Sequence, residues 1–437
     1  MANRKSWFCG SPDHAISRRG FLGMSAAGAA AATVADMTVL DALQSPAMAE
    51  ELKKRDKRVI LLWLAGGASQ LETFDPKPGR PTGGPFRSIQ TNVPGVNVCE
   101  LMPQMSMNLQ HTAIIRSLNT RIGDHGGGSR LMHLGRRDEP NLKYPDLGAM
   151  LARELSQADS QVPDYVTFYT ATEGRGNAVG RSGFLGARFN PMFLTTDPVP
   201  KYLRKLEGIT VDDHKERSDL RKLLSRRFAR GRKSASLASH NEAYARVRGL
   251  MSSEKLFDTS KEPQSMKDLY GPTLFGQQAL VARRLIEAGV PFVKVSRAWW
   301  DSHGQNFETH QELVPELDRV MYALITDLKQ RGMLENTLII TNAEFGRTPN
   351  INPSLGRDHF ARAWTTTLTG CGVKGGSVYG ATDKDGQHVK DGQIGAAEFF
   401  ATIFRALGID HEKEYHVGSR PVPLTDPGTK AVKQVLA

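Results

Sequence analysis

The chain has 437 residues, of which 39% are hydrophobic and 24% are charged, and its formal net charge is +11. This length and composition are ordinary for one large globular domain, or for one domain with an insertion. No segment after residue 50 is apolar for long enough to cross a membrane. The positive charge is concentrated in residues 201–255, where aromatic side chains for base stacking are sparse. We therefore interpret that run as the solvated face of helices and expect no nucleic-acid partner.

Residues 1–49 have the layout of a twin-arginine signal peptide. The pair Arg18-Arg19 precedes Phe-Leu and a weakly apolar stretch over residues 23–34, which is too short and small-sided for a permanent anchor. Ala-Met-Ala at residues 47–49 is a small-x-small cleavage pattern. We expect export by the twin-arginine route to the periplasm or cell surface, with no transmembrane anchor after cleavage. The alternative is a short amphipathic helix with two solvated arginines.

The mature chain alternates between predicted strands and helices. Short apolar runs predict strands buried on both faces at residues 59–64, 112–118, 165–169, 291–296 and 338–341. Apolar stripes predict helices over residues 274–288 and 314–331, each followed by a glycine. This alternation favours an α/β fold with a mostly parallel sheet flanked by helices. Residues 201–272 lack strand signals, and we interpret them as a helical insertion or cap within a domain spanning residues 50–437.

Two cysteines, Cys99 and Cys371, remain after the leader is removed. They could pair in an oxidising compartment, or they could be two buried thiols. The sequence contains no cysteine cluster of the kind that binds metals.

Side chains able to bind metals follow the last two predicted strands, at the sheet edge where ligands gather. Asp301 and His303 lie two apart in a glycine-containing loop and could converge on one cation. Alternatively, Asp301 caps backbone amides in a surface turn. Glu344 emerges directly from a buried strand and needs a partner, which could be Arg347, a metal ion or both.

Two further groups lie in polar or glycine-rich loops. Asp358 and His359, preceded by Arg357, could supply a ligand while the arginine holds an anionic ester oxygen. His125 could be a base or a ligand, and Ser129 an exposed nucleophile at a glycine-rich turn. A flexible loop is the alternative for Ser129. The sequence has no G-x-S-x-G elbow, which argues against a serine esterase of the α/β-hydrolase kind.

Several strings together resemble the domain of unknown function 1501 family. They are GGASQLETFDPKPG, LVARRLIEAGVPFVKV, WDSHGQNF, EFGRTPNIN, GRDHF and GVKGGSVYGATD. The resemblance spans residues 59–410, and this family is similar to sulfatases within the alkaline-phosphatase-like superfamily. Members of the family are typically exported by the twin-arginine route.

The resemblance implies an α/β fold with metal ions at the carboxyl edge of a central sheet, cleaving phosphate or sulfate esters. It places Asp301, His303, Glu344 and His359 at the superfamily's later metal ligands. It places His125 in the region that carries or supports the nucleophile.

The chain departs from the superfamily pattern at two places. Members usually carry Asp directly after the first strand, where this chain has Gly-Gly-Ala-Ser at residues 66–69. They usually carry Asp-His after the later strand, where this chain has Glu344-Phe345. The nearest substitutes in the first loop are Glu72 and Asp75, for which a structural role is equally open. A site with one metal, or with none, is therefore also consistent with the sequence.

The leading hypothesis is an exported hydrolase of sulfate or phosphate esters on a small molecule or polysaccharide, using a divalent ion (Zn, Ca, Mg or Mn). Either Ser129 or a water on the metal would attack. The alternative is a non-catalytic envelope protein that keeps the fold and works with envelope partners. A third reading is an anionic-polysaccharide binder that uses residues 201–255. The candidate metal ligands are Asp301, His303, Glu344, Asp358 and His359, and the candidate catalytic residues are His125, Ser129, Arg347 and Arg357.

Overall fold

The computed structural model describes residues 56–157, 160, 162–168, 180–194, 208–230, 244 and 254–437. The chain divides into two compact units, residues 1–55 and 56–437. The predicted signal peptide lies outside the described residues, and so do parts of the predicted insertion. The second unit is therefore the part of the chain in which the fold and the candidate site are described.

An eight-stranded mixed sheet forms the centre of this unit, in the order β12-β4-β11-β8-β1-β7-β5-β6. Its pairings are parallel except those of β11, which runs antiparallel to both β4 and β8. The strands are β1 (Arg58–Leu64), β4 (Thr112–Leu118), β5 (Tyr165–Phe168), β6 (Met192–Leu194), β7 (Phe292–Arg297), β8 (Thr337–Asn342), β11 (Trp364–Gly370) and β12 (Val378–Tyr379). The predicted mostly parallel sheet is confirmed.

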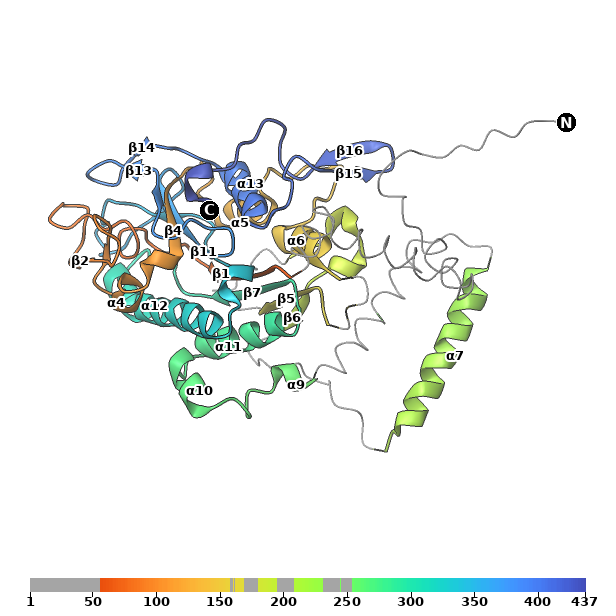
Figure 1. Cartoon of the computed structure of the whole chain (residues 1–437). Helices are drawn as coiled ribbons and strands as arrows, with labels where there is room; N and C mark the ends of the chain where they lie inside the picture. The colour runs from red at the N-terminus through yellow and green to blue at the C-terminus, as the bar shows by residue number, and fades with distance from the viewer. Residues whose placement is uncertain are drawn as a thin grey trace, which may run out of the picture. The chain divides into compact units, whose positions relative to one another are not determined.

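Helices cover both faces of the sheet, as Figure 1 shows, with α11 and α12 on one side and α5, α6 and α13 on the other. The described helices are α4 (Pro103–Ser106), α5 (His125–Leu134), α6 (Leu147–Leu155), α7 (Val211–Ala229), α9 (Glu254–Phe257), α10 (Gln264–Tyr270), α11 (Leu274–Glu287), α12 (Asn306–Gln330) and α13 (Ala396–Ala406). Shorter strands pair in small two-stranded sheets: β2 (Ser88–Gln90) with β3 (Asn97–Cys99), β9 (Gly346–Arg347) with β10 (His359–Phe360), β13 (Ala381–Thr382) with β14 (Val389–Asp391), and β15 (Glu414–Val417) with β16 (Arg420–Pro423).

The sequence of β1, RVILLWL, explains its place inside the sheet. All seven of its residues are buried, so it has no polar face to present to water. A strand of this kind is stable only when paired on both edges and covered on both faces. It pairs with β7 on one edge and β8 on the other. The five strands predicted from apolar runs are β1, β4, β5, β7 and β8, and each boundary differs from the prediction by at most one residue.

The start of α12 was predicted wrongly. The apolar stripe indicated a start at Val314, whereas the helix begins at Asn306 and contains Pro315. Its first two turns bury Asn306, His310 and Leu313, which follow helical spacing but are mostly polar. A hydrophobic pattern does not detect such a face, because two of the three side chains are polar: His310 accepts a hydrogen bond from the Ser69 amide, and Asn306 accepts one from the Ser302 hydroxyl.

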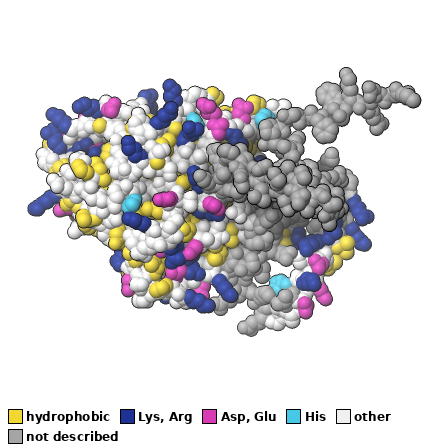
Figure 2. Space-filling model, viewed as in Figure 1, with side chains coloured by type: hydrophobic (Ala, Val, Ile, Leu, Met, Phe, Trp, Pro, Cys, Tyr) yellow, Lys and Arg dark blue, Asp and Glu magenta, His cyan; other side chains and the backbone are white. Residues whose placement is uncertain are grey.

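The predicted insertion at residues 201–272 contains α7, α9 and α10, and its described residues include no strand. Its status as a separate insertion or cap stays a prediction. On the face shown in Figure 2, Lys and Arg side chains are spread over several elements and interspersed with Asp and Glu. None of the described helices has the length and apolar character that a membrane span requires. Cys99 and Cys371 are buried and free, which agrees with the interpretation of two buried thiols.

The direction of the strands decides where the polar loops meet. β1, β7 and β8 are mutually parallel, so their carboxyl ends lie at one edge of the sheet. β4 has the same direction, because β11 runs antiparallel to both β4 and β8. The loops that carry Gly66, His125, Asp301 and Glu344 follow these four strands. This edge is where ligands bind in open α/β sheets.

Candidate metal centre

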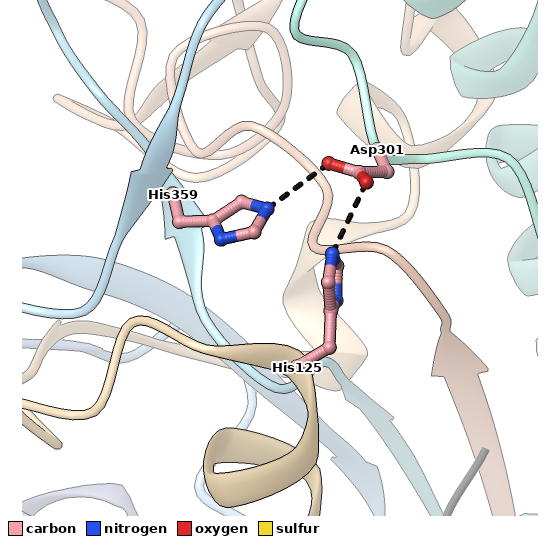
Figure 3. A group of neighbouring side chains, drawn as sticks. All are labelled: His125, Asp301 and His359. Carbon is pink, nitrogen blue, oxygen red and sulfur yellow. Dashed lines mark hydrogen bonds and ion pairs between the residues drawn. The ribbon is translucent and has the colours of Figure 1, made fainter. Parts of the chain in front are cut away.

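Asp301 lies at the centre of a cluster of histidines at the carboxyl edge of the sheet. His125, Asp301 and His359 form a group that could hold a metal ion, with one candidate ligand atom from each lying within 4.8 Å of the others. Figure 3 shows both imidazole rings pointing toward the carboxylate of Asp301. His303 reaches the same carboxylate, with its Nε2 atom 3.1 Å from Oδ1. The structure therefore brings three imidazoles to one carboxylate.

Each residue of the group is placed by a different element. Asp301 follows β7 by a short loop, and its side chain is only 4% exposed. His125 is the first residue of α5, whose start is fixed by Asp124, since Oδ1 of Asp124 accepts a hydrogen bond from the Gly127 amide at 2.7 Å. His359 lies in β10, which pairs with β9 just after Glu344.

Each of the three rings has its Nδ1 atom beside an oxygen that accepts hydrogen bonds. The pairs are His125 with Oε1 of Glu344 at 2.9 Å, His303 with Oδ1 of Asp358 at 2.7 Å, and His359 with the carbonyl oxygen of Gly123 at 2.8 Å. Ionised carboxylates and carbonyls can only accept, so each Nδ1 carries the ring proton that it donates. In a neutral ring this leaves the Nε2 lone pair free. Histidines that bind metals are usually held in this way.

The Nε2 atoms converge on the two carboxylate oxygens of Asp301. Nε2 of His303 and of His359 lie 3.1 and 3.2 Å from Oδ1, and 3.0 Å from each other. Nε2 of His125 lies 3.1 Å from Oδ2. Lone pairs at these distances repel unless a proton or a cation lies among them. Ligands of a tetrahedral ion with bonds of about 2.0–2.1 Å are spaced by roughly 3.3 Å, so the donor set fits a metal ion.

The electrostatics of the group also favour a positive species beside Asp301. Burial alone would raise the pKa of Asp301, but hydrogen bonds from His125 and His359 and the charge of Arg347 hold it well below its usual range. Burial likewise lowers the pKa of His125, yet its bonds to Asp301 and Glu344 outweigh this and raise it to about 9. In the metal-free arrangement His125 is an imidazolium, and a metal ion would replace the proton on Nε2.

Glu344, predicted as a metal ligand, is placed behind His125 rather than among the Nε2 atoms. Its Oε1 accepts hydrogen bonds from Nδ1 of His125 and from the backbone amide of Gly66 at 2.8 Å. Gly66 has a φ of 109°, and a Cβ there would lie 2.5 Å from the Asp301 amide nitrogen. The backbone of the Gly-Gly loop therefore approaches a carboxylate of the chain itself.

Arg347 is fully buried beneath the same loop. Its guanidinium donates to the carbonyl oxygens of Gly66, of Gly67 at 2.9 Å and of Arg357 at 3.1 Å, and to Oδ1 of Asp301 at 2.6 Å. It therefore links the first loop to Asp301. Contact with substrate, which the sequence suggested for Arg347, stays a prediction, and its burial argues against it.

Arg357 is also fully buried, and all of its guanidinium N–H donors form hydrogen bonds within the protein. Its Nη2 lies 2.7 Å from Oε1 of Glu72, and its other N–H groups bond to Glu72 and to carbonyl oxygens of Thr82, Thr348 and Pro349. All five guanidinium hydrogens have an acceptor. This leaves no donor for the ester oxygen that the sequence suggested it would hold. Glu72 has a structural role, which was one of its two interpretations.

The remaining predicted residues differ in their access to solvent. His303 is the open side of the cluster, with a side chain 48% exposed. Asp358 is exposed and orients His303 rather than facing Asp301. Ser129 lies within α5, is buried, and its carbonyl accepts from Nδ1 of His133. Its role as an exposed nucleophile stays a prediction that the burial does not favour.

A cavity beside His359 involves residues that sequence reasoning missed. It has a volume of about 400 Å³ and is lined by Asn119, Arg121, Gly123, His359, Phe360, Ala361 and Arg362. We name it the basic pocket. Arg121 follows the carboxyl end of β4, which is the positional signal that could have drawn attention to it. Arg362 has no such signal, because it joins the pocket only through the pairing of distant loops.

His310 supports the first loop from below. Its Nε2 accepts a hydrogen bond from the Ser69 amide at 3.0 Å, and its Nδ1 donates to the carbonyl oxygen of Asn306 at 2.8 Å. Burial lowers the pKa of His310 to about 4, and the charges of Arg347 and Arg357 act in the same direction, while Glu72 and the Asn306 bond act against it. The ring is therefore neutral at physiological pH.

Replacement of Asp301 by Asn should abolish metal binding, because it removes the carboxylate that all three Nε2 atoms face. Asp358→Asn should weaken affinity by about 10- to 100-fold, since it loosens only the ring of His303. Metal content after gel filtration, together with competition against a chromophoric chelator, measures both effects. Asp383→Asn is the control, because Asp383 holds His388 in a similar pair outside the group. Full metal content in the Asp301 variant would contradict this assignment.

The stability of the protein should fall as the pH is lowered from about 6.5 to about 4. In this window the unfolded chain protonates His310 while the folded chain does not, so the contribution of the neutral ring is present above pH 6.5 and lost below it. The loss is about 3 kcal/mol at most. Urea unfolding of the wild type and of His310→Gln across this range measures it, and the stability difference between them should shrink toward pH 4. A difference that is constant with pH would contradict the prediction.

The structure is similar to solved structures of low sequence identity. PsFucS1 sulfatase from Pseudoalteromonas sp. matches with 12% identity and a TM-score of 0.40, over 84% of this chain and 72% of that chain. A protein in the alkaline phosphatase superfamily from Vibrio parahaemolyticus matches with 12% identity and a TM-score of 0.34, over 81% and 66%. A mutant TAB5 alkaline phosphatase with Mg bound matches with 12% identity and a TM-score of 0.35, over 81% and 99%. No functional conclusion follows from scores this low.

Comparison of the amino-acid sequence with known families identifies the family of the chain. No curated protein matches the chain. The family model described as "Protein of unknown function (DUF1501)" matches residues 56–436, which is nearly all of the described unit. The resemblance found in the motifs is thereby confirmed, and the chain belongs to the DUF1501 family.

Proposed function

We propose that the protein is a metal-dependent hydrolase of sulfate or phosphate esters that acts outside the cytoplasm. The observation that carries this proposal is the convergence of three Nε2 atoms on Asp301, each ring held from behind by an oxygen acceptor. In the metal-free arrangement the Nε2 of His125 carries a proton that a metal ion would replace, and the rings of His303 and His359 face the same carboxylate. The substrate would be a small molecule or a polysaccharide that carries the ester.

The donor set narrows the identity of the metal. Imidazole nitrogens with one carboxylate suit Zn²⁺ and related transition ions, whereas Ca²⁺ and Mg²⁺ favour oxygen ligands. We therefore propose zinc or a similar ion, held by Asp301, His125 and His359 with His303 at the open side. Such an ion supplies Lewis-acid polarisation of the ester and stabilises charge that develops on the transferred group.

The protein residues behind the cluster would act by positioning. Arg347 holds one oxygen of Asp301 and the carbonyls of the Gly-Gly loop, so the carboxylate cannot rotate without breaking these bonds. Glu344 accepts a hydrogen bond from Nδ1 of His125 and thereby directs Nε2 toward the site. His303, exposed on the solvent side, leaves a path by which an ester can reach the group.

Two observations favour the non-catalytic alternative. Ser129 is buried, and the first loop contributes backbone groups rather than a carboxylate to the cluster. A hydrolase built on this cluster would therefore depend on water as the nucleophile. We call Asp301, His125, His359 and His303 the metal group. If no ester is turned over, an envelope binding protein that retains this group becomes the better interpretation.

Export by the twin-arginine route is part of the proposal and is supported by the leader sequence. Arg18 and Arg19, the weakly apolar stretch and the Ala-Met-Ala site occur in the order that such leaders require. A protein with a metal group formed by three distant segments has a reason to fold before it is transported, because the group does not exist in the unfolded chain.

Hydrolysis of 4-nitrophenyl sulfate or 4-nitrophenyl phosphate by the purified mature protein should be lost on treatment with a chelator and restored by Zn²⁺. Asp301→Ala should lower the rate by about two orders of magnitude or more, because it removes the central ligand. Asp383→Ala, outside the group, should retain full activity. Turnover of neither ester under any metal would refute the hydrolase and favour the binding protein.

Conversion of Arg18 and Arg19 together to Lys should block export while preserving the leader's charge, because the twin-arginine route reads the arginine pair itself. The mature and uncleaved forms can be distinguished by mass spectrometry of periplasmic and cytoplasmic fractions. Arg4→Lys, in the same leader, is the matched control and should be exported normally. Unchanged export of the double variant would exclude this route.

A further inference from the structure

The basic pocket adjoins the metal group through His359. His359 lines the pocket, and its Nε2 faces Asp301. Gly123 also lines the pocket, and its carbonyl oxygen accepts a hydrogen bond from Nδ1 of His359. The pocket and the carboxylate of Asp301 therefore both lie next to His359. At about 400 Å³ the pocket is in the size range of small-molecule sites, which is larger than one sulfate or phosphate group requires.

The charge of the pocket is entirely positive. Arg121 and Arg362 are exposed, and none of the residues that line it is acidic. Within the described part of the chain, neither guanidinium forms a hydrogen bond or an ion pair. This distinguishes them from Arg347 and Arg357, whose donors are used inside the protein. Arginines at a concave site whose guanidinium donors are not used within the protein can bind sulfate, phosphate or carboxylate groups.

The backbone holds these two arginines in place. The amides of Thr120 and Arg121 both donate to the carbonyl oxygen of Ala361, at 2.9 and 3.1 Å. This fixes the loop after β4 against the residue that precedes Arg362. Arg121 has a φ of 58°, a conformation that costs energy for a residue other than glycine. Strain of this kind persists where the surrounding structure imposes it, often at binding sites.

A polar side chain at the pocket also lacks a partner. Asn119 donates from Nδ2 to Oε1 of Gln393 at 2.9 Å, which fixes its orientation, but its Oδ1 is buried without a hydrogen bond. This buried atom is out of reach of a molecule in the pocket, so Asn119 contributes to the wall and not to ligand contacts. The pocket thus offers two cationic groups to a single molecule.

We propose that the basic pocket binds a second anionic group of the substrate, with Arg121 and Arg362 as specificity-determining residues. This inference rests on the proposed function, in that the first anionic group is the ester at the metal group. The preferred substrates are then esters that carry at least two sulfate or phosphate groups within one small unit.

Binding of sulfonates that cannot be hydrolysed tests this proposal without requiring turnover. The mature protein, loaded with Zn²⁺, is titrated with 1,3-propanedisulfonate and with 1-propanesulfonate by calorimetry. The disulfonate should bind about tenfold more tightly or better, because its second group is held by two arginines. Arg121→Gln with Arg362→Gln should remove this preference and reduce the disulfonate to the affinity of the monosulfonate.

The controls separate this proposal from the hydrolase itself. Arg87→Gln with Arg130→Gln also removes two exposed arginines, but outside the pocket, and should leave the preference intact. Arg362→Lys should retain part of it, and melting temperatures show whether each variant is folded. Equal affinities of the two sulfonates, or a preference unchanged in the pocket variant, would overturn the second-anion site. Lack of ester turnover with the disulfonate preference intact would instead count against the hydrolase alone.

Discussion

The carboxylate of Asp301 is 4% exposed, and a negative charge at that depth has to be compensated within the protein. Arg347 supplies one positive charge, and the imidazole of His125 supplies another in the metal-free arrangement. The loops that approach this carboxylate come from four strands, and their positions depend on it. The Gly-Gly loop after β1 can lie so close only because residue 66 has no Cβ.

The four arginines near the cluster fall into two pairs, one buried and one exposed. Arg347 and Arg357 are buried and donate to carbonyl and carboxylate oxygens of the protein, so they organise the loops. Arg121 and Arg362 stay at the surface of the basic pocket. The same residue type thus serves structure on one side of the cluster and, as we propose, recognition on the other. Mutations of the two pairs should accordingly differ, the first affecting stability and the second affecting ligand selectivity.

Much of the fold could be predicted because apolar runs of β1, β4, β5, β7 and β8 report burial on both faces. β11, with the sequence WTTTLTG, was missed. Three of its four threonines are buried, and two of these form hydroxyl hydrogen bonds within the sheet: Thr366 donates to the carbonyl oxygen of Thr341 at 2.6 Å, and Thr369 bonds to the hydroxyl of Thr112 at 2.8 Å. Threonine favours strands, but it is polar and therefore does not contribute to an apolar sequence pattern. The early start of α12 was missed for the same reason, since its first buried side chains are polar.

The sequence by itself determined the family, the segments that form five of the strands and which loops reach the carboxyl edge of the sheet. These follow from local patterns and from the rule that parallel strands end on the same side. Only the tertiary structure decided the role of each polar residue at that edge. Whether Glu344 or Asp358 faces the cluster or supports a histidine from behind depends on segments far away in the chain. The physical reason is that a side chain's hydrogen-bond partners are set by packing, which no local pattern records.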